Sequence, residues 1–335
     1  MSSLPNPAAP PARTYCNPLI DLDFPDPAVF RAEDGLFYVY ATQSHHPVVN
    51  LQVARSADLV SWETLDDAMP VKPDWASATQ QFWAPSPIFA DGRYFLYYSA
   101  KPDAALTNRS IGLSLGVATS DRPEGPFVDC GRPLQGGRKF INIDPFPFDD
   151  PATGKRLLYW GSGFHPIKVQ ELAEDRISFA PGSTPVDLIE PDRTTDPADY
   201  QRLIEGAWVT LRDGFYYLFY SGDNCCGKRA HYAVMVARSA IATGPFEVAQ
   251  EPFHHVVVAN DRWNAPGHNS VIRDAAGNDW IVYHAVDRTR SRRAPRASVN
   301  SRRMMVMDRI VWRDGWPTVA TGGPSSTDQP APVTS

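Results

Sequence analysis

The sequence predicts an all-β protein that folds as a five-bladed β-propeller in a single domain. Three observations support this prediction: five segments repeat one order of strands and turns, the segments are almost evenly spaced, and the composition is rich in turn-forming and aromatic residues. The chain of 335 residues contains 32 prolines, 22 glycines and 11% aromatic residues. This composition favours short strands joined by tight turns.

Each repeated segment has a short apolar strand, a polar or glycine-containing turn, and a second strand rich in aromatic residues. The turns carry Asp-Gly, Gly or Gly-Asn, which tolerate the positive φ angles that hairpins need. The segments start at positions separated by 58, 60, 61 and 63 residues: Asp26, Ala84, Asp144, Glu205 and His268. A repeat of this length is the main sign of how the chain is organised.

A third strand is expected in every segment, and a short fourth strand is expected after it. The expected fourth strands read SWETL, GPFVDC, ISFAPG, GPFEVA and IVWRDG. Five units of four antiparallel strands, with no helical segments between them, match a propeller. A β-sandwich would have similar strand spacing, but it does not require five units of nearly equal length.

No domain boundary interrupts the repeats, so residues 15–320 are expected to form the propeller. Residues 1–14 are rich in Pro and Ala, residues 321–335 are rich in Gly, Pro and Ser, and both segments are expected to be disordered. The N-terminal segment lacks the apolar stretch of a signal peptide, which fits either a cytoplasmic protein or a secreted one whose signal has been removed. No stretch is apolar enough to cross a bilayer.

The net charge of −6 and a pI near 5.7 argue against nucleic acid as a partner. Seven arginines between Arg288 and Arg303 are interpreted as a solvated or substrate-facing loop. The pairs His45-His46 and His254-His255 have no partners at ligand spacing, so surface or core positions are expected for them. The four cysteines form no disulfide framework in a chain of this length.

The first strand of each propeller blade lines the central channel, so the starting residues of the segments should meet at one end of it. Asp26, Asp144 and Glu205 would place three carboxylates there, beside His268. The second segment offers Trp83 next to its start. Crowded, buried carboxylates repel one another and cost desolvation energy, so packing alone does not explain them. They suggest acid–base chemistry or a hard-cation site.

Each of these residues also has a structural interpretation. Asp26 and Asp144 precede proline, and Asp-Pro commonly begins a turn. His268 could cap a strand, and Trp83 could lie in the core. The combination, spaced with the repeat, favours a functional site.

The segments resemble glycoside hydrolase family 43, the five-bladed arabinanases, arabinofuranosidases and xylosidases, over nearly the whole chain. The resemblance is carried by NPL..DFPDPAVF, FWAPSP, INIDPFPF, IEGAWV, GHNSVI and RRMMVMDRIVWRDGWP. A single Asp-Pro pair is a weak motif. The order and blade spacing of the whole set make it specific.

The resemblance implies a role for each residue that matches a family motif. Asp26 is similar to the general base that activates water, and Glu205 to the general acid that protonates the leaving oxygen. Asp144 resembles the third carboxylate, which holds the acid in place and raises its pKa. The implied substrate-binding and metal residues are the following: Trp83 as an aromatic wall, Arg303 as a substrate-binding arginine, and His268 beside the site, in contact through a water-rich shell with a structural calcium ion in the channel.

These residue types suit hydrolysis of a glycosidic bond with inversion, which needs one protonated and one ionised carboxyl about 6.5–9.5 Å apart. No cofactor is required for that chemistry. The expected partner is an oligosaccharide or polysaccharide, and nothing in the sequence indicates an oligomeric state.

The stretch around Cys225 and Cys226 resembles the arabinan-acting members, so α-L-arabinofuranosides are the preferred substrates, cleaved by an arabinofuranosidase or exo-arabinanase. A β-xylosidase or an endo-arabinanase of the same family remains an alternative. A non-catalytic sugar-binding propeller and a retaining fructan hydrolase are two further alternatives.

Overall fold

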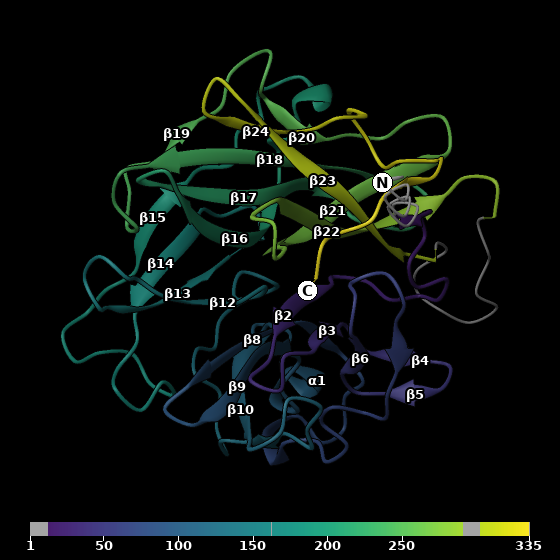
Figure 1. Ribbon diagram of the computed structural model, residues 1–335. Helices are drawn as coiled ribbons and strands as arrows, with labels where there is room; N and C mark the ends of the chain where they lie inside the picture. Colours follow the sequence, from purple (N-terminus) through teal and green to yellow (C-terminus); the bar gives the residue numbers. More distant parts are fainter. Residues whose placement is uncertain (1–12, 162, 291–301, 335) are drawn as a thin grey trace, which may run out of the picture.

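The computed structural model describes residues 13–161, 163–290 and 302–334, and these residues form a five-bladed propeller. Figure 1 shows the blades following one another around the ring in chain order, from purple to yellow. The inner strands touch in a closed circle, because each one contacts the inner strands of the two neighbouring blades. The predicted fold is therefore confirmed.

Each blade is an antiparallel sheet whose strands run outward from the channel in chain order. Blade 1 contains β2 (Ala28–Arg31), β3 (Phe37–Ala41), β6 (Gln52–Ser56) and β7 (Glu63–Thr64). Blade 2 contains β8 (Phe82–Ala90), β9 (Arg93–Ala100), β10 (Ser114–Ser120) and β11 (Val128–Asp129). Blade 3 contains β12 (Phe146–Asp149), β13 (Arg156–Trp160), β14 (Ile167–Glu171) and β15 (Val186–Ile189).

Blade 5 has the longest inner strand, with 11 residues, and blade 4 has an additional strand. Blade 4 contains β16 (Ile204–Arg212), β17 (Phe215–Asn224), β18 (His231–Ser239) and β19 (Glu247–Val248), and β20 (His255–Val257) also pairs with β18. Blade 5 contains β21 (Trp263–Arg273), β22 (Asp279–Asp287), β23 (Met304–Arg313) and β24 (Trp316–Val319).

The remaining elements are short and lie outside the blades. They are β1 (Thr14–Tyr15), β4 (Ser44–His45), β5 (Val48–Val49), β25 (Gln329–Pro330), the helix α1 (Ala104–Thr107), and two 3₁₀ turns, η1 (Asp74–Ala76) and η2 (Pro197–Asp199). No helix among the described residues is long and apolar enough to cross a membrane.

Two of the five expected fourth strands were placed wrongly. In blade 3 the fourth strand is β15 rather than ISFAPG, of which only Phe179 forms an isolated bridge, to Leu172. In blade 5 the residues IVWRDG end the third strand, and β24 follows after the turn. In both cases the prediction relied on a short apolar stretch near a turn. Which stretch forms the fourth strand depends on whether its backbone pairs with the third strand of the blade, and a local pattern does not show this.

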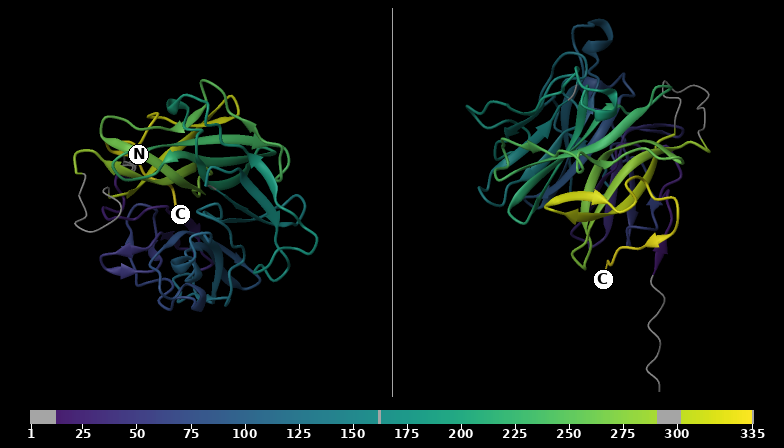
Figure 2. Two further views of the ribbon diagram at one scale, coloured as in Figure 1. Left: turned by 180° about the vertical axis from the view of Figure 1, so that it is seen from behind. Right: turned by 90° about the horizontal axis from the view of Figure 1, so that it is seen from above.

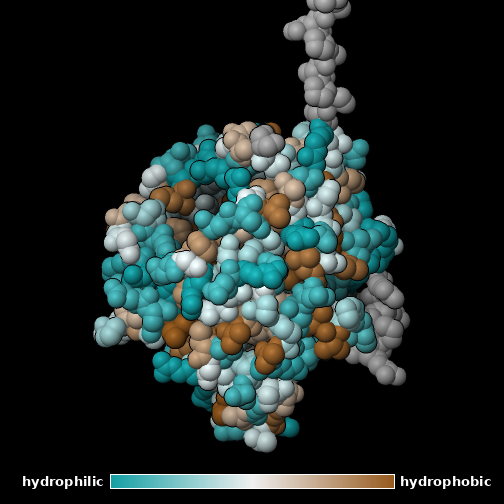
Figure 3. Space-filling view, turned by 60° about the horizontal axis from the view of Figure 1, so that its bottom comes forward, coloured by the Kyte–Doolittle hydropathy of each residue, from teal (hydrophilic) through white to brown (hydrophobic). Residues whose placement is uncertain are grey.

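The core lies between neighbouring blades, where aromatic residues of one sheet pack against the next. Tyr40, Tyr97, Tyr159 and Tyr283 come from the second strands of four blades and are fully buried. On the face drawn in Figure 3, hydrophobic residues are scattered among hydrophilic ones, so the apolar surface is used inside the ring.

The C-terminal segment 321–335 was expected to be disordered, and the structure corrects this for residues 321–334, which are the ones it describes. Strand β25 pairs with β1, with Thr14 opposite Pro330, and the right-hand view in Figure 2 shows this yellow strand beside the purple N-terminal one. The Ser325 carbonyl accepts a hydrogen bond from the Trp263 indole at 3.1 Å. A polar composition alone did not reveal these backbone and indole partners. Of the N-terminal segment 1–14, residues 1–12 lie outside the described residues.

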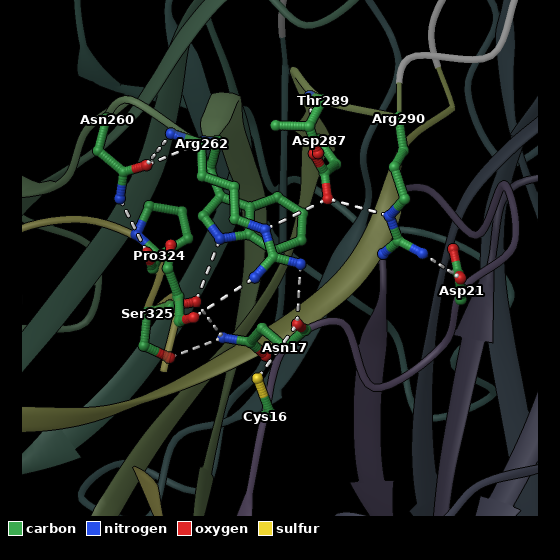
Figure 4. A network of polar contacts seen from close by, with 12 residues as sticks. Cys16, Asn17, Asp21, Asn260, Arg262, Asp287, Thr289, Arg290, Pro324 and Ser325 are labelled. Atoms are coloured by element: carbon green, nitrogen blue, oxygen red, sulfur yellow. Dashed lines mark hydrogen bonds and ion pairs between the residues drawn. The ribbon is translucent and has the colours of Figure 1, made fainter. Parts of the chain in front are cut away.

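A polar network joins residues 16–21, which precede blade 1, to blade 5 and to the C-terminal segment (Figure 4). Its centre is Asp287, whose buried carboxylate receives Arg262 and Arg290, each at 3.3 Å. Arg262 also donates to the Asn17 carbonyl at 3.4 Å, and Arg290 to Asp21 at 2.8 Å. This network closes the ring between the last blade and the first.

The inner strands are aligned by a second ring of hydrogen bonds. A residue with left-handed backbone lies at the equivalent position of each repeat, just before the inner strand in blades 1 and 3 and within it in the others: φ is 60° at Asp26, 48° at Ala84, 58° at Asp144, 66° at Gly206 and 50° at His268. In four of the five positions the backbone N–H of this residue donates to a side chain at the end of the preceding blade's second strand. These pairs are Ala84 to Thr42 at 2.9 Å, Asp144 to Ser99 at 3.0 Å, His268 to Ser221 at 2.8 Å and Asp26 to His284 at 3.2 Å.

Blade 3 breaks this pattern, because the corresponding residue is Gly161 and has no side chain. The N–H of Gly206 instead donates to the Asp144 carboxylate at 3.1 Å. The head of β16 is therefore held by an acidic residue of the neighbouring blade. The same contact brings Asp144 next to the turn that carries Glu205.

The substitution Ser99→Ala tests the inter-blade ring of hydrogen bonds. Ser99 is fully buried, so its removal leaves the Asp144 N–H without an acceptor. We expect the free energy of unfolding to fall by about 1–3 kcal/mol, measured by urea denaturation. Ser120→Ala is the matched control, since the Ser120 hydroxyl accepts only an exposed backbone N–H, and it should change the stability little. Equal effects of the two substitutions would contradict this role of Ser99.

Candidate active site

The structure brings the three predicted acids and two of their predicted neighbours together at one end of the channel. Asp26 and Asp144 are buried, with 7% and 6% of their surface exposed, and His268 lies between them. The His268 Nδ1 atom is 3.5 Å from Asp26 Oδ1 and 3.8 Å from Asp144 Oδ2. Glu205 joins the group through its charge interaction with Asp144.

Asp26 is held as a carboxylate by the groups around it. Arg303 Nη1 donates to Asp26 Oδ1 at 3.2 Å, and the Thr42 hydroxyl donates to Oδ2. Burial raises the pKa of Asp26, but the Arg303 guanidinium, together with His268 and His284, more than offsets this and holds that pKa well below its usual range. Asp26 is therefore ionised at neutral pH, as a general base must be.

The pKa of Asp144 shifts in the opposite direction. Burial raises it well above the ordinary carboxyl range, and the negative charge of Glu205 raises it further. This repulsion was expected from the sequence to raise the pKa of Glu205, which stays a prediction; the structure shows its effect on Asp144. A proton is therefore retained within the Asp144–Glu205 pair at pH values where exposed acids are ionised.

Glu205 is oriented by Tyr232, whose hydroxyl donates to Glu205 Oε1 at 2.9 Å. Tyr232 lies in β18 and is buried, and burial raises its pKa well above the usual value, so it remains a neutral donor. Its ring needs Gly267 beside it, because a Cβ atom there would come within 2.1 Å of the ring. The glycine in GHNSVI thus makes room for the tyrosine that contacts Glu205.

Arg303 is a buried part of the acid cluster. Its backbone N–H donates to Asp23 Oδ1 at 2.9 Å, and its Nη1 atom also contacts Cys225 Sγ at 3.9 Å. The Phe24 N–H donates to the Arg303 carbonyl at 2.8 Å. Contacts of Asp23 and Phe24 with the backbone just before β23 therefore place this guanidinium beside Asp26.

Glu205 occupies a different repeat position from the one that the sequence predicted. The residue equivalent to Asp26 and Asp144 is Gly206, which has the left-handed backbone at the head of its strand. Glu205 precedes it by one residue and is therefore equivalent to Trp83. A Cβ atom on Gly206 would come within 3.3 Å of the His268 ring, so the acid stands one position earlier, where its side chain has room.

Trp83 begins the second blade near the site, in β8 beside Ala84. It is half-buried and lies opposite Ser99 in the sheet. The equivalence with Glu205 places it at the same level of the ring. Its role as an aromatic wall of the sugar pocket stays a prediction.

The predicted calcium contact of His268 does not fit the groups around this ring. Calcium takes oxygen ligands, whereas the Asp26 carboxylate near His268 already binds the Arg303 guanidinium and the Thr42 hydroxyl. The positive charge of Arg303 also opposes a second cation there. Burial lowers the pKa of His268, so the ring is a neutral neighbour of both carboxyl groups.

Three residues at the site were not identified from the sequence: Thr42, Tyr232 and His284. Thr42 and His284 occupy one repeat position at the end of the second strand, which Ser99 and Ser221 share, so an alignment of all five segments could have found them. His284 Nδ1 is 3.3 Å from Asp26 Oδ1, and burial lowers the pKa of this histidine to about 4. Tyr232 has no such repeat signal.

The channel below the acids narrows to a cavity of about 10 Å³, lined in part by Ser86, Trp208 and Asn269. This is room for about one water molecule. A larger cavity of about 650 Å³ lies outside the ring, between β1, β22, β23 and the C-terminal segment, and contains none of the acids. Its size is therefore no guide to where the chemistry takes place.

A family model described as glycosyl hydrolases family 43 matches residues 15–317. The chain belongs to glycosyl hydrolase family 43. The predicted enzyme class is thereby confirmed: the protein is an inverting glycoside hydrolase, and the acid cluster is its candidate active site.

Relatives in the family differ in their named substrates. A β-D-galactofuranosidase of Aspergillus niger is 27% identical over 319 residues, covering 89% of this chain and 82% of the relative. An extracellular endo-α-(1→5)-L-arabinanase of Bacillus subtilis is 27% identical, covering 80% and 79%. An extracellular exo-α-(1→5)-L-arabinofuranosidase of Cellvibrio japonicus is 26% identical, covering 89% and 86%.

Among solved structures, a thermostable family-43 glycoside hydrolase is similar with a TM-score of 0.75 at 26% identity. The alignment covers 95% of this chain and 99% of that one. The five-bladed ring described above is thus shared over the full length of a solved family member.

The substitution Asp144→Asn tests the proton retained at the Asp144–Glu205 pair. The raised pKa of Asp144 means that ionising this group in the folded protein costs stability. The wild-type stability should therefore fall as the pH rises from about 4, the ordinary carboxyl value, through the raised folded pKa. Asn can still accept the Gly206 N–H but does not titrate. We expect the variant to lose this pH slope and to gain stability relative to the wild type towards neutral pH, measured by denaturation at a series of pH values.

Asp26→Asn is the matched control for this measurement. The lowered pKa of Asp26 contributes stability that is present above about pH 4 and is lost as the pH falls through the folded pKa, so this variant should be less stable than the wild type at neutral pH. If both variants changed stability in the same direction, the opposite charge states assigned to the two acids would be wrong.

The substitution Tyr232→Phe tests the positioning of Glu205. Without the Tyr232 hydroxyl, the carboxylate form of Glu205 loses a hydrogen bond and becomes less stable. The proposed proton donor then gives up its proton less readily, so kcat should fall about tenfold. The pKa of Glu205 should rise, which moves the alkaline limb of the pH–rate profile to higher pH. The measurement is kcat and KM against pH on an aryl glycoside that the wild type cleaves. Tyr220→Phe is the control, because the buried Tyr220 hydroxyl bonds Gln201 instead. An unmoved profile in Tyr232→Phe would rule out this role.

Proposed function

We propose that the protein hydrolyses α-L-arabinofuranosidic linkages with inversion, as an arabinofuranosidase or exo-arabinanase acting on arabinan or arabino-oligosaccharides. The observation that carries the proposal is the pairing of an ionised Asp26 with a proton retained at Asp144 and Glu205, in one buried cluster. Direct displacement by water needs one carboxyl group in each of these charge states.

In the proposed reaction Asp26 removes a proton from water as the water oxygen attacks the anomeric carbon. The glycosidic C–O bond breaks, and Glu205 gives its proton to the leaving oxygen. Tyr232 stabilises the carboxylate that forms on Glu205, and the Glu205 proton is restored from solvent. Arg303 keeps Asp26 ionised and lies close enough to it to contact the hydroxyl groups of the bound sugar.

The choice of arabinose is supported by two of the three relatives described above, of which one is named an endo-α-(1→5)-L-arabinanase and the other an exo-α-(1→5)-L-arabinofuranosidase. The third relative is named for another furanose, galactofuranose. The exo mode, with release of single sugars, is the narrower part of the proposal. The endo-arabinanase of Bacillus subtilis is the relative that argues for the other mode.

The proposal is tested with aryl α-L-arabinofuranoside, aryl β-D-xyloside, aryl β-D-galactofuranoside and linear arabinan, with the products sized by chromatography. We expect hydrolysis of the arabinofuranoside, release of arabinose from arabinan, and the inverted anomer as the first product seen by proton NMR. If the xyloside or galactofuranoside were cleaved faster, that sugar would be the substrate instead of arabinofuranoside. Early release of oligosaccharides from arabinan would show an endo mode of attack instead of the exo mode.

Glu205→Ala is the catalytic control in the same experiment. Loss of the general acid should lower kcat by about 10²–10⁴ on a substrate with a poor leaving group, and much less on one with a good leaving group. If the Glu205→Ala variant cleaved arabinan at the wild-type rate, Glu205 would not be the general acid. Saturable sugar binding by the wild type without any released sugar would instead indicate a non-catalytic binding protein.

A further inference from the structure

Two adjacent histidines at the edge of blade 4 lie beside a carboxylate that the sequence did not connect with them. His254 and His255 stand at the start of β20, which pairs with β18, with His255 opposite Met235. Each of Glu251, His254 and His255 offers one ligand atom, and these atoms all lie within 4.8 Å of one another. The turn at 250–253, closed by the Phe253 N–H on the Gln250 carbonyl, brings Glu251 back towards the histidines.

His255 has one ring nitrogen engaged and one free. The ring hydrogen-bonds to the backbone at Ala198, in η2. Its Nε2 atom is buried and has no hydrogen-bond partner among the described residues. A ring nitrogen buried without a partner costs free energy unless a ligand occupies it. A histidine fixed through one nitrogen by a backbone group, with the other left open, has the arrangement of metal-binding histidines.

His254 is positioned by the same neighbouring loop. Its Nε2 atom is 3.2 Å from Gln201 Nε2, and the Gln201 side chain also contacts the Tyr220 hydroxyl at 3.2 Å. The opposite ring nitrogen, Nδ1, is 3.9 Å from Glu251 Oε1. The two imidazole rings are stacked, with their centroids 4.4 Å apart and their planes 12° from parallel, so one ring must turn before both rings can point a nitrogen at the same ion. Both histidines are thus supported from behind by residues of the loop at 198–201.

We propose that Glu251, His254 and His255 bind one divalent transition-metal ion of the zinc class. Two imidazoles and one carboxylate are ligands that suit Zn²⁺, Ni²⁺ or Cu²⁺, whereas Ca²⁺ and Mg²⁺ prefer sites made of oxygen atoms. With bonds of about 2.1 Å, neighbouring ligand atoms of a tetrahedral ion are about 3.4 Å apart. The gap of 3.9 Å between Glu251 and His254 must therefore close by about 0.5 Å, and a pair at the 4.8 Å limit by about 1.4 Å; Glu251 is exposed and able to move.

The bound ion would also fasten a loop that leads to the active site. Ala198 and Gln201, the residues behind the two histidines, lie shortly before β16, whose second residue is Glu205. None of the three ligands belongs to the acid cluster. The site therefore acts on stability and on the support of that loop, and takes no part in the proton transfers.

The test uses the untagged full chain, freed of metal with a chelator and titrated with Zn²⁺ by calorimetry. We expect one ion per chain, and a rise in the unfolding temperature of about 5 °C when free zinc is at about 100 times its dissociation constant. Glu251→Gln and His255→Ala should each weaken binding at least tenfold, and both should leave hydrolysis of an aryl glycoside by the metal-free protein unchanged. Glu251→Gln changes an exposed side chain, so it keeps the test valid if His255→Ala folds poorly.

His45→Ala is the matched control, because His45 and His46 form the other adjacent histidine pair. Among the described residues no third ligand joins that pair within the same reach, so its zinc affinity should equal that of the wild type. The double variant Cys225→Ser/Cys226→Ser removes the thiols as an alternative zinc site, and it should still bind one ion. The absence of binding in the wild type, or binding that survives Glu251→Gln and His255→Ala but is lost with the thiols, would overturn the proposal.

Discussion

The ion pair between Asp26 and Arg303 is the interaction on which the active site depends. Two other carboxyl groups and a neutral histidine share the same buried space, and the Arg303 charge is the largest of the contributions that lower the pKa of Asp26 against the effect of burial. The guanidinium is brought there by contacts that close the ring: the N-terminal segment holds both sides of the Arg303 backbone, through Asp23 and Phe24. The contacts that close the propeller therefore also position the charge that favours the ionised form of Asp26.

The acid cluster of the candidate active site forms where the fivefold pattern is broken. Four blades hold the head of the next inner strand with a Thr, Ser or His side chain, whereas blade 3 has Gly161 at that position. Asp144 replaces the missing acceptor and binds the Gly206 N–H. A single contact thus keeps blades 3 and 4 in register and places Asp144 against Glu205. The hydrogen bond from Gly206 to Asp144, which links blades 3 and 4, also keeps the carboxyl groups of Asp144 and Glu205 close enough to repel each other.

The join between blade 5 and blade 1 is held by polar groups, and no strand among the described residues is exchanged between these two blades. Blade 5 takes all four of its strands from the end of the chain, and the join to blade 1 is made by β1 with β25 and by the network around Asp287. Burial raises the pKa of Asp287, but its hydrogen bonds, first with Thr289, lower it to about 2. Its negative charge is therefore present whenever the protein is folded near neutral pH, and it keeps both arginines attached to the join.

The sequence by itself determined the five blades, the antiparallel order of their strands, the family, and the three acids with His268 and Arg303, because a strand-turn-strand repeat and short motifs are local properties of the chain. The tertiary structure alone decided which acid is ionised, since charge depends on burial and on neighbours such as Arg303 that are hundreds of residues away. It also decided that Glu205 stands one position before the repeat, that Tyr232 contacts it, and that the C-terminal segment is ordered. Those outcomes rest on hydrogen bonds and close contacts between different blades, which no local pattern records.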